Sequence, residues 1–437
     1  MFRKVSIFRK FSNYVSNFVY YFLICDKIML RGEMLMKYIE RTDYLNFLLN
    51  HKDKQIIKVV TGIRRCGKST LFEIFKDYLL ASGISKKQII SINLEDITYQ
   101  DKSYKELYFD ITKKLVKGKM TYIFLDEIQN CPNFEKMVDS LFIQPNVDIY
   151  LTGSNAYFMS GELATLLSGR YVELKMLTLS FKEYVTGSDT SKSLLSQYND
   201  YITYSSFPYT LQYKGNLKAT QDYLRGIYST ILLKDVVQRY KITDVMMLES
   251  VASFVFDNIG NRLSANNIAN TLSSMGRVTN DRTIEKYLQA LMDSLIIYQA
   301  KRYNIKGRQL LKTQAKYYVA DLGLRYLLCG IKGQDEGHIL ENVIFLELIR
   351  RGYNVTIGQN ETNEIDFVAN NQNDTIFIQV CFSLRDEKTY KREMLPLKSL
   401  NNNYPKMILT MDESPIKDDN GVKIIYALDW LLNKNNV

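Results

Sequence analysis

The most constraining feature of this chain is a Gly-x-x-x-x-Gly-Lys-Ser sequence at residues 62–69, with an apolar run before it and a helical pattern after it. A strand, a loop and a helix in this order are the context in which such a sequence forms a phosphate-binding loop. Gly62 and Gly67 let the backbone wrap closely around a phosphate chain, with amide groups pointing inward. The helix begins at the loop, so the positive end of its dipole faces the phosphates. The sequence therefore predicts a nucleotide site at one edge of a parallel sheet.

The side chains of this loop have more specific predicted roles. Lys68 can reach the β- and γ-phosphate oxygens, and the Ser69 hydroxyl can ligate a magnesium ion, so ATP and Mg²⁺ are the expected cofactors. Arg64 and Arg65 can contact the nucleotide, contact a partner or face solvent. The nucleotide-binding residues are expected to be Gly62, Ile63, Arg64, Arg65, Cys66, Gly67, Lys68, Ser69 and Thr70.

A second motif decides between nucleotide binding and hydrolysis. Residues 122–125 are apolar, as in a strand buried on both faces of a parallel sheet, and Asp126 and Glu127 follow directly. Open α/β sheets bind ligands at such strand ends. Asp126 is expected to hold the magnesium ion through water, and Glu127 to orient and deprotonate the attacking water. A further strand leads to Ser154 and Asn155, which can either touch the γ-phosphate or cap the next helix.

These motifs and several later ones resemble those of prokaryotic AAA+ ATP-binding proteins that carry a C-terminal domain of unknown function. The resemblance covers about residues 36–380, and it implies an AAA+ ATPase. The matching segments are residues 62–70, 125–127, 151–154, 167–170, 179–181 and 317–324. Within them, Arg170 is the candidate for a charge that reaches the γ-phosphate, in its own subunit or in a neighbour's. A salt bridge at a helix end is the alternative role for Arg170.

Composition excludes several classes of site. The 5 cysteines never stand in a Cys-x-x-Cys spacing and there are only 2 histidines, which argues against a disulfide framework, a structural zinc or a His-based triad. A reducing cytoplasm fits this usage best. Residues 1–35 contain an apolar run too short to span a bilayer. They are expected to be a loose extension or an over-called start, with a peripheral membrane anchor as the alternative.

The pattern along the chain predicts an α/β protein in which three parts follow residues 1–35. Residues 36–195 alternate apolar strands with amphipathic helices, which predicts a P-loop NTPase parallel sheet with helices on both faces. Residues 196–330 are predicted to form a helical, winged-helix domain, and residues 331–437 a small α/β domain. The expected strands of the first part are residues 56–60, 88–93, 121–125, 147–151 and about 171–174.

The second part carries the basic excess. Residues 201–330 have a net charge of +8 and residues 1–35 of +4, against +10 for the whole chain, which indicates a polyanionic partner. Residues 263–272, with a cap at Ser264, and 281–291 read as a helix pair, and residues 295–300 read as a strand. The second helix is expected to enter the major groove of double-stranded DNA with Arg282 and Lys286 exposed. A basic hairpin would contact phosphates through Lys301, Arg302, Lys306, Arg308, Lys312 and Lys316. A purely structural packing module is the alternative.

The third part resembles the PD-(D/E)xK nuclease core. Its helix at residues 339–350 carries Glu341, and its two strands carry Asp366 and Gln379. In that fold, carboxylates hold magnesium and a lysine activates or positions the water. Gln379 stands where a second acid is usual, and Cys381 stands where the lysine is usual. The weaker metal binding and missing ammonium predict a degenerate, inactive site, unless Lys388 or Lys391 substitutes from a neighbouring helix.

Together these features predict an ATPase that couples ATP binding and hydrolysis to a basic winged-helix module, with DNA as partner. Two other classes of function stay open. One is a signalling or defence switch in which ATP orders a protein–protein contact or self-association. The other is a nuclease gated by ATP.

Overall fold

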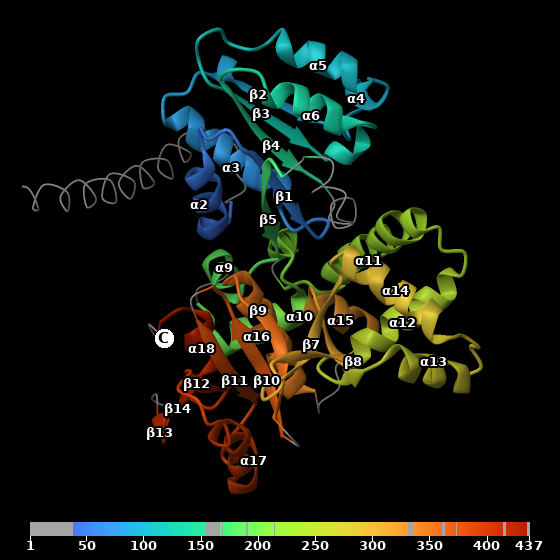
Figure 1. The fold of residues 1–437 in the computed structure, drawn as a ribbon, viewed down its shortest axis with the longest axis vertical. Coiled ribbons are helices and arrows are strands. Elements are labelled where there is room, and N and C mark those ends of the chain that lie inside the picture. Colours follow the sequence, from blue (N-terminus) through green and yellow to red (C-terminus); the bar gives the residue numbers. More distant parts are fainter. Residues whose placement is uncertain are drawn as a thin grey trace, which may run out of the picture.

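The computed structural model has the predicted α/β architecture (Figure 1). The expected N-terminal extension lies outside the described residues, and so do the candidates Ser154 and Asn155. The structure describes residues 38–153, 167, 169–188, 191–213, 215–330, 335–360, 363–372, 374–413 and 417–434, without the side chains of residues 312 and 313.

The first part of the chain builds a parallel sheet of five strands in the order β2-β3-β4-β1-β5. Every predicted strand is present, and β4 lies between β1, which leads into the phosphate loop, and β3, which carries Asp126. The strands are β1 (Ile57–Gly62), β2 (Ile89–Asn93), β3 (Thr121–Asp126), β4 (Val147–Thr152) and β5 (Tyr171–Met176).

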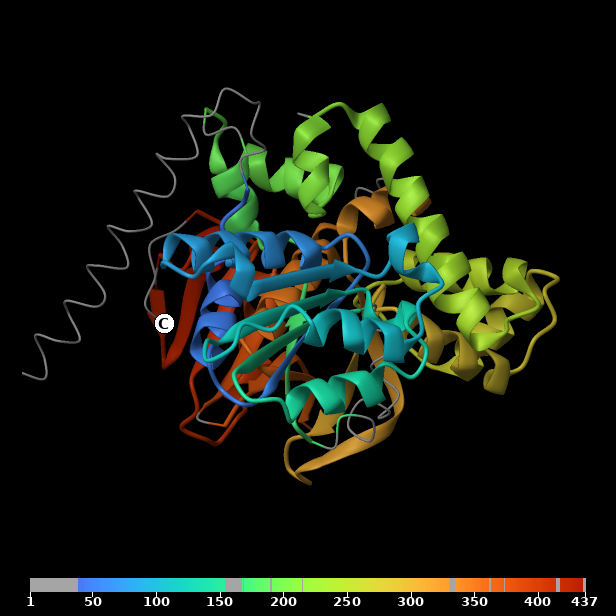
Figure 2. The same cartoon turned by 90° about the horizontal axis from the view of Figure 1, so that it is seen from above.

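Helices cover both faces of this sheet, as Figures 1 and 2 show. Because successive side chains of a strand point to opposite faces, Phe124 packs in one buried cluster with Phe72 of α3, and Leu125 in another with Phe134 of α6. The helices of this part are α2 (Thr42–His51), α3 (Lys68–Ala81), α4 (Ile97–Gln100), α5 (Tyr104–Thr112) and α6 (Phe134–Phe142), with short 3₁₀ turns η1 (Lys86–Gln88) and η2 (Ile128–Asn130).

The middle of the chain is mainly helical. Helix α11 continues directly into an eight-residue π-helix, η4 (Ile231–Gln238). The other elements of this part are α9 (Phe181–Gly187), α10 (Leu194–Tyr204), the 3₁₀ helix η3 (Pro208–Tyr213), α11 (Leu217–Thr230), α12 (Val245–Asp257), α13 (Ala265–Ser274), α14 (Asp281–Asp293) and α15 (Leu322–Cys329).

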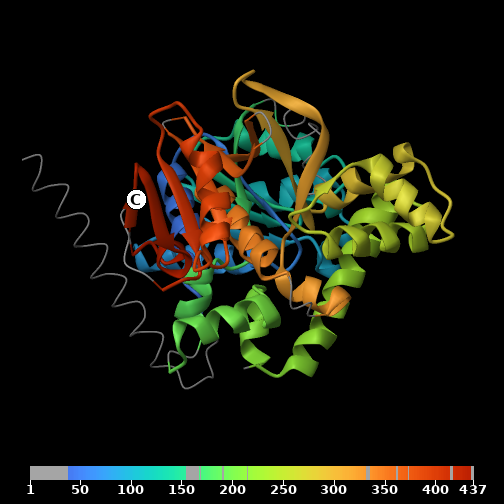
Figure 3. The same ribbon diagram turned by 90° about the horizontal axis from the view of Figure 1, so that it is seen from below.

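A small antiparallel sheet joins this helical part. It contains β6 (Arg262–Leu263), β7 (Ile297–Asn304) and β8 (Gln309–Val319), and both β6 and β7 pair with β8. The predicted cap of α13 is confirmed, because the Ser264 side chain accepts a hydrogen bond from the amide of Asn267 at 3.2 Å. The order α12–β6–α13–α14–β7–β8 therefore places two helices next to a hairpin, and Figure 3 shows that hairpin, in orange-gold, projecting from the body of the molecule.

The C-terminal part extends the same sheet to nine strands, in the order β13-β14-β12-β11-β10-β9-β7-β8-β6. Strand β9 pairs in parallel with β7, so the domain boundary predicted near residue 330 falls within one continuous sheet. The remaining elements are α16 (Glu336–Arg350), β9 (Asn354–Asn360), β10 (Asn363–Asn370), β11 (Thr375–Cys381), α17 (Glu387–Lys398), β12 (Lys406–Thr410), β13 (Lys417–Asp419), β14 (Val422–Tyr426) and α18 (Ala427–Leu431).

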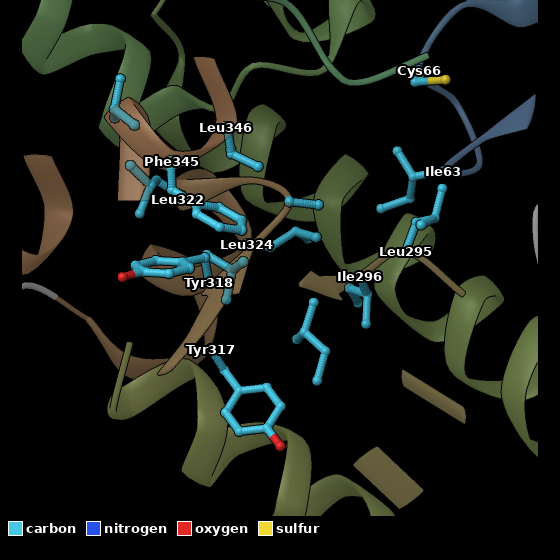
Figure 4. Packing of buried hydrophobic residues seen from close by; sticks show 14 of the residues in the cluster. Ile63, Cys66, Leu295, Ile296, Tyr317, Tyr318, Leu322, Leu324, Phe345 and Leu346 are labelled. Atoms are coloured by element: carbon cyan, nitrogen blue, oxygen red, sulfur yellow. The ribbon is translucent and has the colours of Figure 1, made fainter. Parts of the chain in front are cut away.

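One buried apolar cluster connects the phosphate loop to the nine-stranded sheet. Figure 4 shows Ile63 and Cys66 of the loop near Leu295 and Ile296, and further along Tyr318, in the same cluster. Hydrophobic burial contributes about 25 cal/mol per Å² of apolar surface, so a continuous cluster resists separation of the parts that share it.

Two buried arginines on one glutamate add polar links to this junction. Glu183, which caps α9 together with Ser180, accepts hydrogen bonds from Arg41 at 3.0 Å. Arg350, from the end of α16, lies 3.8 Å from the same carboxylate and donates to the carbonyl of Thr178 at 3.0 Å. Residues before the first sheet, after it and in the C-terminal part therefore meet at one carboxylate.

The charge on Glu183 is predicted to stabilise the fold. Burial alone would raise the pKa of Glu183, but the charges of Arg41 and Arg350 lower it below the usual 4.5. Glu183→Gln leaves Arg41 without its counterion and Arg350 with Glu347 alone, and we expect it to lower the free energy of unfolding at pH 7 by about 3 kcal/mol. Glu387→Gln, which removes an exposed carboxylate, should change it by less than about 0.5 kcal/mol.

The pH dependence of this difference in stability follows from the direction in which the pKa of Glu183 is shifted. A depressed pKa gives stability that is present above pH 4.5 and is lost as the pH falls through the folded-state pKa. Thermal melts should therefore show the wild type and Glu183→Gln converging below pH 4.5. A difference in melting temperature that stays constant down to pH 3 would contradict the assigned charge pairing.

Candidate functional site

The backbone of the phosphate loop is fixed by its two glycines. A Cβ atom on Gly62 would lie 2.3 Å from the carbonyl oxygen of Met176, because β5 passes directly against the end of β1. Gly67 caps α3 with φ +104°, a left-handed conformation that other residues rarely adopt. The helix therefore begins immediately after the loop, with its first amides at the carboxyl edge of the sheet.

The loop residues divide by the direction of their side chains. Ile63 and Cys66 are buried in the apolar cluster of Figure 4, so only their backbone can face a phosphate. Lys68 is also buried, and its Nζ donates to the carbonyl of Gly62 at 3.1 Å. Ser69 and Thr70 are exposed in the first turn of α3. The loop thus offers one ammonium and two hydroxyls on a common side.

The two acidic residues after β3 share one threonine. The Thr152 hydroxyl donates to the Asp126 carboxylate and accepts the amide of Glu127 at 3.0 Å. Glu127 has φ +52°, and its carboxylate accepts a 2.5 Å hydrogen bond from Gln129. Thr152 is not among the predicted site residues, which include Ser154 instead. Its position at the end of β4, next to β3, marks it as a neighbour of Asp126.

The phosphate loop and Glu127 line one cavity of about 600 Å³. Its charged lining includes Arg41, Lys68, Glu127, Glu95 and both loop arginines, together with the hydroxyls of Ser69 and Thr70. Its apolar lining includes aromatic and aliphatic residues from segments that carry no recognisable motif: Tyr38, Ile39, Pro208, Tyr209, Leu211 and Tyr223. The cavity is therefore suited to a ligand with charged and apolar groups.

The Arg64 side chain lines this cavity and contacts acidic residues of two other segments. Its guanidinium donates two hydrogen bonds to Asp235 of η4, at 3.0 and 3.2 Å, and lies 3.6 Å from Glu95. Burial alone would lower the pKa of Arg64, but the charges of Asp235, Glu127 and Glu95 raise it above its usual value. The phosphate loop and the helical part are therefore joined by a charged, two-pronged contact.

The structure corrects the expected role of Arg170 within its own subunit. Arg170 precedes β5 and its carbonyl accepts the amide of Ile57, so it lies at the amino edge of the sheet. Six residues of extended strand put it about 20 Å from the loop, at about 3.3 Å per residue. There it lies 3.8 Å from Asp139 and over the ring of Phe142. A role in a neighbouring subunit's site stays a prediction.

A second polar cluster brings together the three residues of the nuclease-like pattern. Glu341, Asp366 and Gln379 line one pocket, in which Lys316 of β8 lies among the carboxylates. The Lys316 Nζ is 2.8 Å from Glu341, 3.1 Å from Glu364 and 3.3 Å from Asp366. Burial raises the pKa of Glu341 to about 7, although Lys316 opposes this shift.

Several expectations for this pocket and for the hairpin are wrong. Lys316 is buried rather than free to contact phosphates. Arg302 is partly exposed and donates to Gln359 at 2.9 Å, and its contact with DNA stays a prediction. Neither Lys388 nor Lys391 lines the pocket. Helix α17 contributes Glu393 instead, which accepts a 2.7 Å hydrogen bond from Gln379. Within the described part of the chain, no group of three His, Cys, Asp or Glu residues could hold a metal ion.

The remaining candidates for DNA contact are exposed. Arg282 and Lys286 point to solvent from α14, while Ile284, Tyr287 and Leu288 of the same helix are buried. Lys301 is exposed on β7. Among the described residues, no helix has both the length and the apolar character needed to cross a membrane.

Two family models match parts of this chain. Residues 54–185 match a family described as an AAA domain, and residues 195–335 match a domain of unknown function (DUF8612). Among solved structures, the Walker-type ATPase PABY2304 of Pyrococcus abyssi aligns over 68% of this chain and 98% of its own, with 16% identity and a TM-score of 0.47. AMPPCP-bound DnaA of Aquifex aeolicus aligns over 57% and 86%, with 11% identity and a TM-score of 0.30.

Two relatives match over most of their length. An uncharacterized protein of Haemophilus influenzae is 39% identical over 399 residues, which are 90% of this chain and 98% of the relative. The uncharacterized protein MJ1544 of Methanocaldococcus jannaschii is 30% identical over 386 residues, 82% of each chain. The chain therefore belongs to the family of these two proteins, and its residues 54–185 match the family described as an AAA domain.

Proposed function

We propose that this protein binds ATP in the cavity at the carboxyl edge of the first sheet and hydrolyses it. The observation that carries the proposal is that Lys68 and Glu127 face the same cavity although 59 residues separate them. A triphosphate lying along the loop meets the start of α3, whose amides and dipole favour negative charge. The apolar side, with its tyrosines, would receive the base of the nucleotide by stacking.

The residues around the loop also fit a magnesium ion. The hydroxyl of Ser69 and the carboxylate of Asp126 are hard oxygen ligands of the kind that Mg²⁺ binds with its waters. The ion would supply neutralisation of the phosphate charge. In the proposed reaction Glu127 accepts the proton of the attacking water, and Gln129 and Thr152 hold Glu127 in place by the hydrogen bonds described above. Lys68 stabilises the charge that develops on the transferred phosphoryl group.

Two substitutions separate binding from turnover. Lys68→Ala should lower ATP affinity at least a hundredfold in titration calorimetry, because the loop loses its ammonium. Glu127→Gln should keep ATP bound and reduce phosphate release by about 100-fold or more, the scale of a lost general base. Lys105→Ala, an exposed lysine on α5, is the matched control and should change neither quantity. Undiminished affinity in Lys68→Ala would remove the loop from the site.

We further propose that the ATPase acts on double-stranded DNA through a winged-helix module made of α12, α13, α14 and the β7–β8 hairpin. Support comes from the arrangement of these elements, from the exposure of Arg282 and Lys286 on α14, and from the +8 net charge of residues 201–330. An exposed helix with basic residues at its start suits the major groove, and Lys301 would approach the phosphates.

DNA binding by this module should depend strongly on salt. Arg282→Glu with Lys286→Glu should weaken binding to duplex DNA by about tenfold or more and reduce the slope of log K against log salt by about 2, since each lost phosphate contact contributes about 1. The measurement is fluorescence anisotropy at two or more salt concentrations. Lys105→Glu with Lys114→Glu, which reverses two exposed charges of the ATPase part, is the charge-matched control. Salt-independent binding, or no binding, would favour the alternative of a switch acting through protein–protein contacts.

For the second pocket, we infer a structural charge cluster and no DNA cleavage. Lys316 places its ammonium among the three carboxylates of Glu341, Glu364 and Asp366, where a nuclease would hold its metal ion. Arg262 also pairs with Glu364, and Arg392 pairs with Glu393, so the fourth acid of the pocket has a cationic partner as well. The cluster joins β8 of the hairpin to α16 and β10, and its role is to hold these elements together.

Replacing Lys316 tests this inference directly. Lys316→Ala should lower the free energy of unfolding by about 3 kcal/mol, because buried carboxylates lose their counterion. Lys316→Ala with Asp366→Ala should recover part of this loss in thermal melts, because fewer buried carboxylates remain without a counterion. Magnesium-dependent nicking of plasmid DNA by the wild type that disappears in Asp366→Ala would overturn the inference and establish a nuclease.

A further inference from the structure

We propose that Arg64 exchanges partners between Asp235 and the terminal phosphate of ATP, so that the helix containing Asp235 reports which nucleotide is bound. The inference rests on the proposed ATP site. It assigns to Asp235, which no sequence motif marks, the role of a positioning residue that acts through Arg64.

The first support is the geometry of the contact. The two hydrogen bonds from the Arg64 guanidinium, to the two oxygens of Asp235, form a bidentate pair, which fixes orientation as well as distance. Asp235 is 8% exposed and Arg64 18% exposed, so the pair is shielded from water on most sides. It joins residues 171 positions apart in sequence and bridges the phosphate loop and the helical part.

The second support is the position of Arg64 in the cavity. Arg64 lines the same cavity as Lys68 and Glu127, and the charge of Glu127 acts on its guanidinium. With Glu127 in its proposed role of activating the water that attacks the terminal phosphate, Arg64 would lie at the terminal end of the triphosphate. The planar guanidinium fits phosphate oxygens as well as it fits a carboxylate, and the terminal phosphate carries the greater charge. ATP and Asp235 are therefore alternative partners for one side chain, and ADP is a weaker competitor.

The third support is the helix that carries Asp235. Asp235 lies in η4, a π-helical segment of eight residues that follows α11 without a break. Long π-helical segments are rare, and short ones occur frequently at functional sites. The same segment buries Ile231, Leu232 and Val236. When Arg64 turns to a phosphate, a buried carboxylate without its partner is unfavourable, so the segment must shift until Asp235 reaches water or another donor.

The shift has a defined route to the rest of the molecule. The helix of η4 ends at Tyr240, and α12 begins five residues later at Val245. Helix α12 packs against α14, the helix that carries Arg282 and Lys286. Exchange at Arg64 would therefore act first on the part of the chain proposed to bind DNA.

Substitution of Asp235 by asparagine tests the competition. Asp235→Asn keeps the size of the side chain but removes its charge, so ATP no longer competes with a carboxylate for Arg64. We expect the Kd for ATP to fall by about tenfold, or 1.4 kcal/mol, and the Kd for ADP to change by less than about twofold. Asp222→Asn, which removes an exposed carboxylate from α11 of the same helix, is the matched control and should leave both values unchanged.

Two further measurements distinguish this mechanism from a general loosening of the fold. In the Arg64→Gln background, Asp235→Asn should give no gain in ATP affinity, because the exchanging side chain is absent. Hydrogen exchange of the amides of residues 231–238 should rise when ATP is added to Glu127→Gln, and should already be high in Asp235→Asn without ATP.

The outcomes separate this inference from the proposed function. An equal gain for ATP and ADP, an unchanged Kd in Asp235→Asn, or a gain that persists in Arg64→Gln would overturn the exchange while leaving ATP binding intact. A wild-type protein that binds no ATP would overturn both the proposed function and the exchange.

Discussion

The carboxylate of Glu183 and its two arginines are the contact on which the rest of the arrangement depends. Arg41 donates at once to Glu183, to the carbonyl of Cys66 in the phosphate loop and to the carbonyls of residues 177 and 178. Arg350 reaches the same region from α16. A buried guanidinium is unfavourable without its hydrogen-bonding partners, so these bonds hold the chain before the first sheet, the loop and the C-terminal part together. The cavity can form only because its walls, from distant segments, are held there.

Helix α16 extends this constraint to the second polar cluster. It carries Arg350 at one end and Glu341 near the other, nine residues or about 13 Å away at 1.5 Å per residue. Both side chains are buried and paired with partners on other elements, Glu183 for one and Lys316 for the other. One rigid helix thus spans the distance between the ATPase part and the hairpin β7–β8. Lys316 therefore stabilises the fold from inside the acidic pocket, where it pairs with Glu341 of this helix.

The parts of this structure that the sequence predicted are those decided by local chemistry. The strands of the first sheet, the loop between Gly62 and Lys68 and the Ser264 cap follow from periodicity, turn chemistry and motif spacing. The proximity of Glu341 and Asp366 was implied by the resemblance to the nuclease core. The errors concern long-range pairing. Lys316 follows five other basic residues, so it was assigned to a phosphate-binding hairpin, although alternation along β8 turns it inward to three carboxylates. Nothing near Asp235 or Tyr223 in sequence marks them as neighbours of the loop, because their position depends on how the helical part packs.

The two arginine contacts of the loop differ in a way that bears on how a nucleotide could act. Both arginines line the cavity, but the donors of Arg41 are used by Glu183 and by the carbonyls of residues 66, 177 and 178. Arg64 donates to one carboxylate, that of Asp235, and offers it the same donors that a phosphate needs. A ligand would therefore leave the link to the C-terminal sheet intact and act on the link to the helical part. The direction of any response follows from the partners that each arginine has, rather than from the strength of either pair.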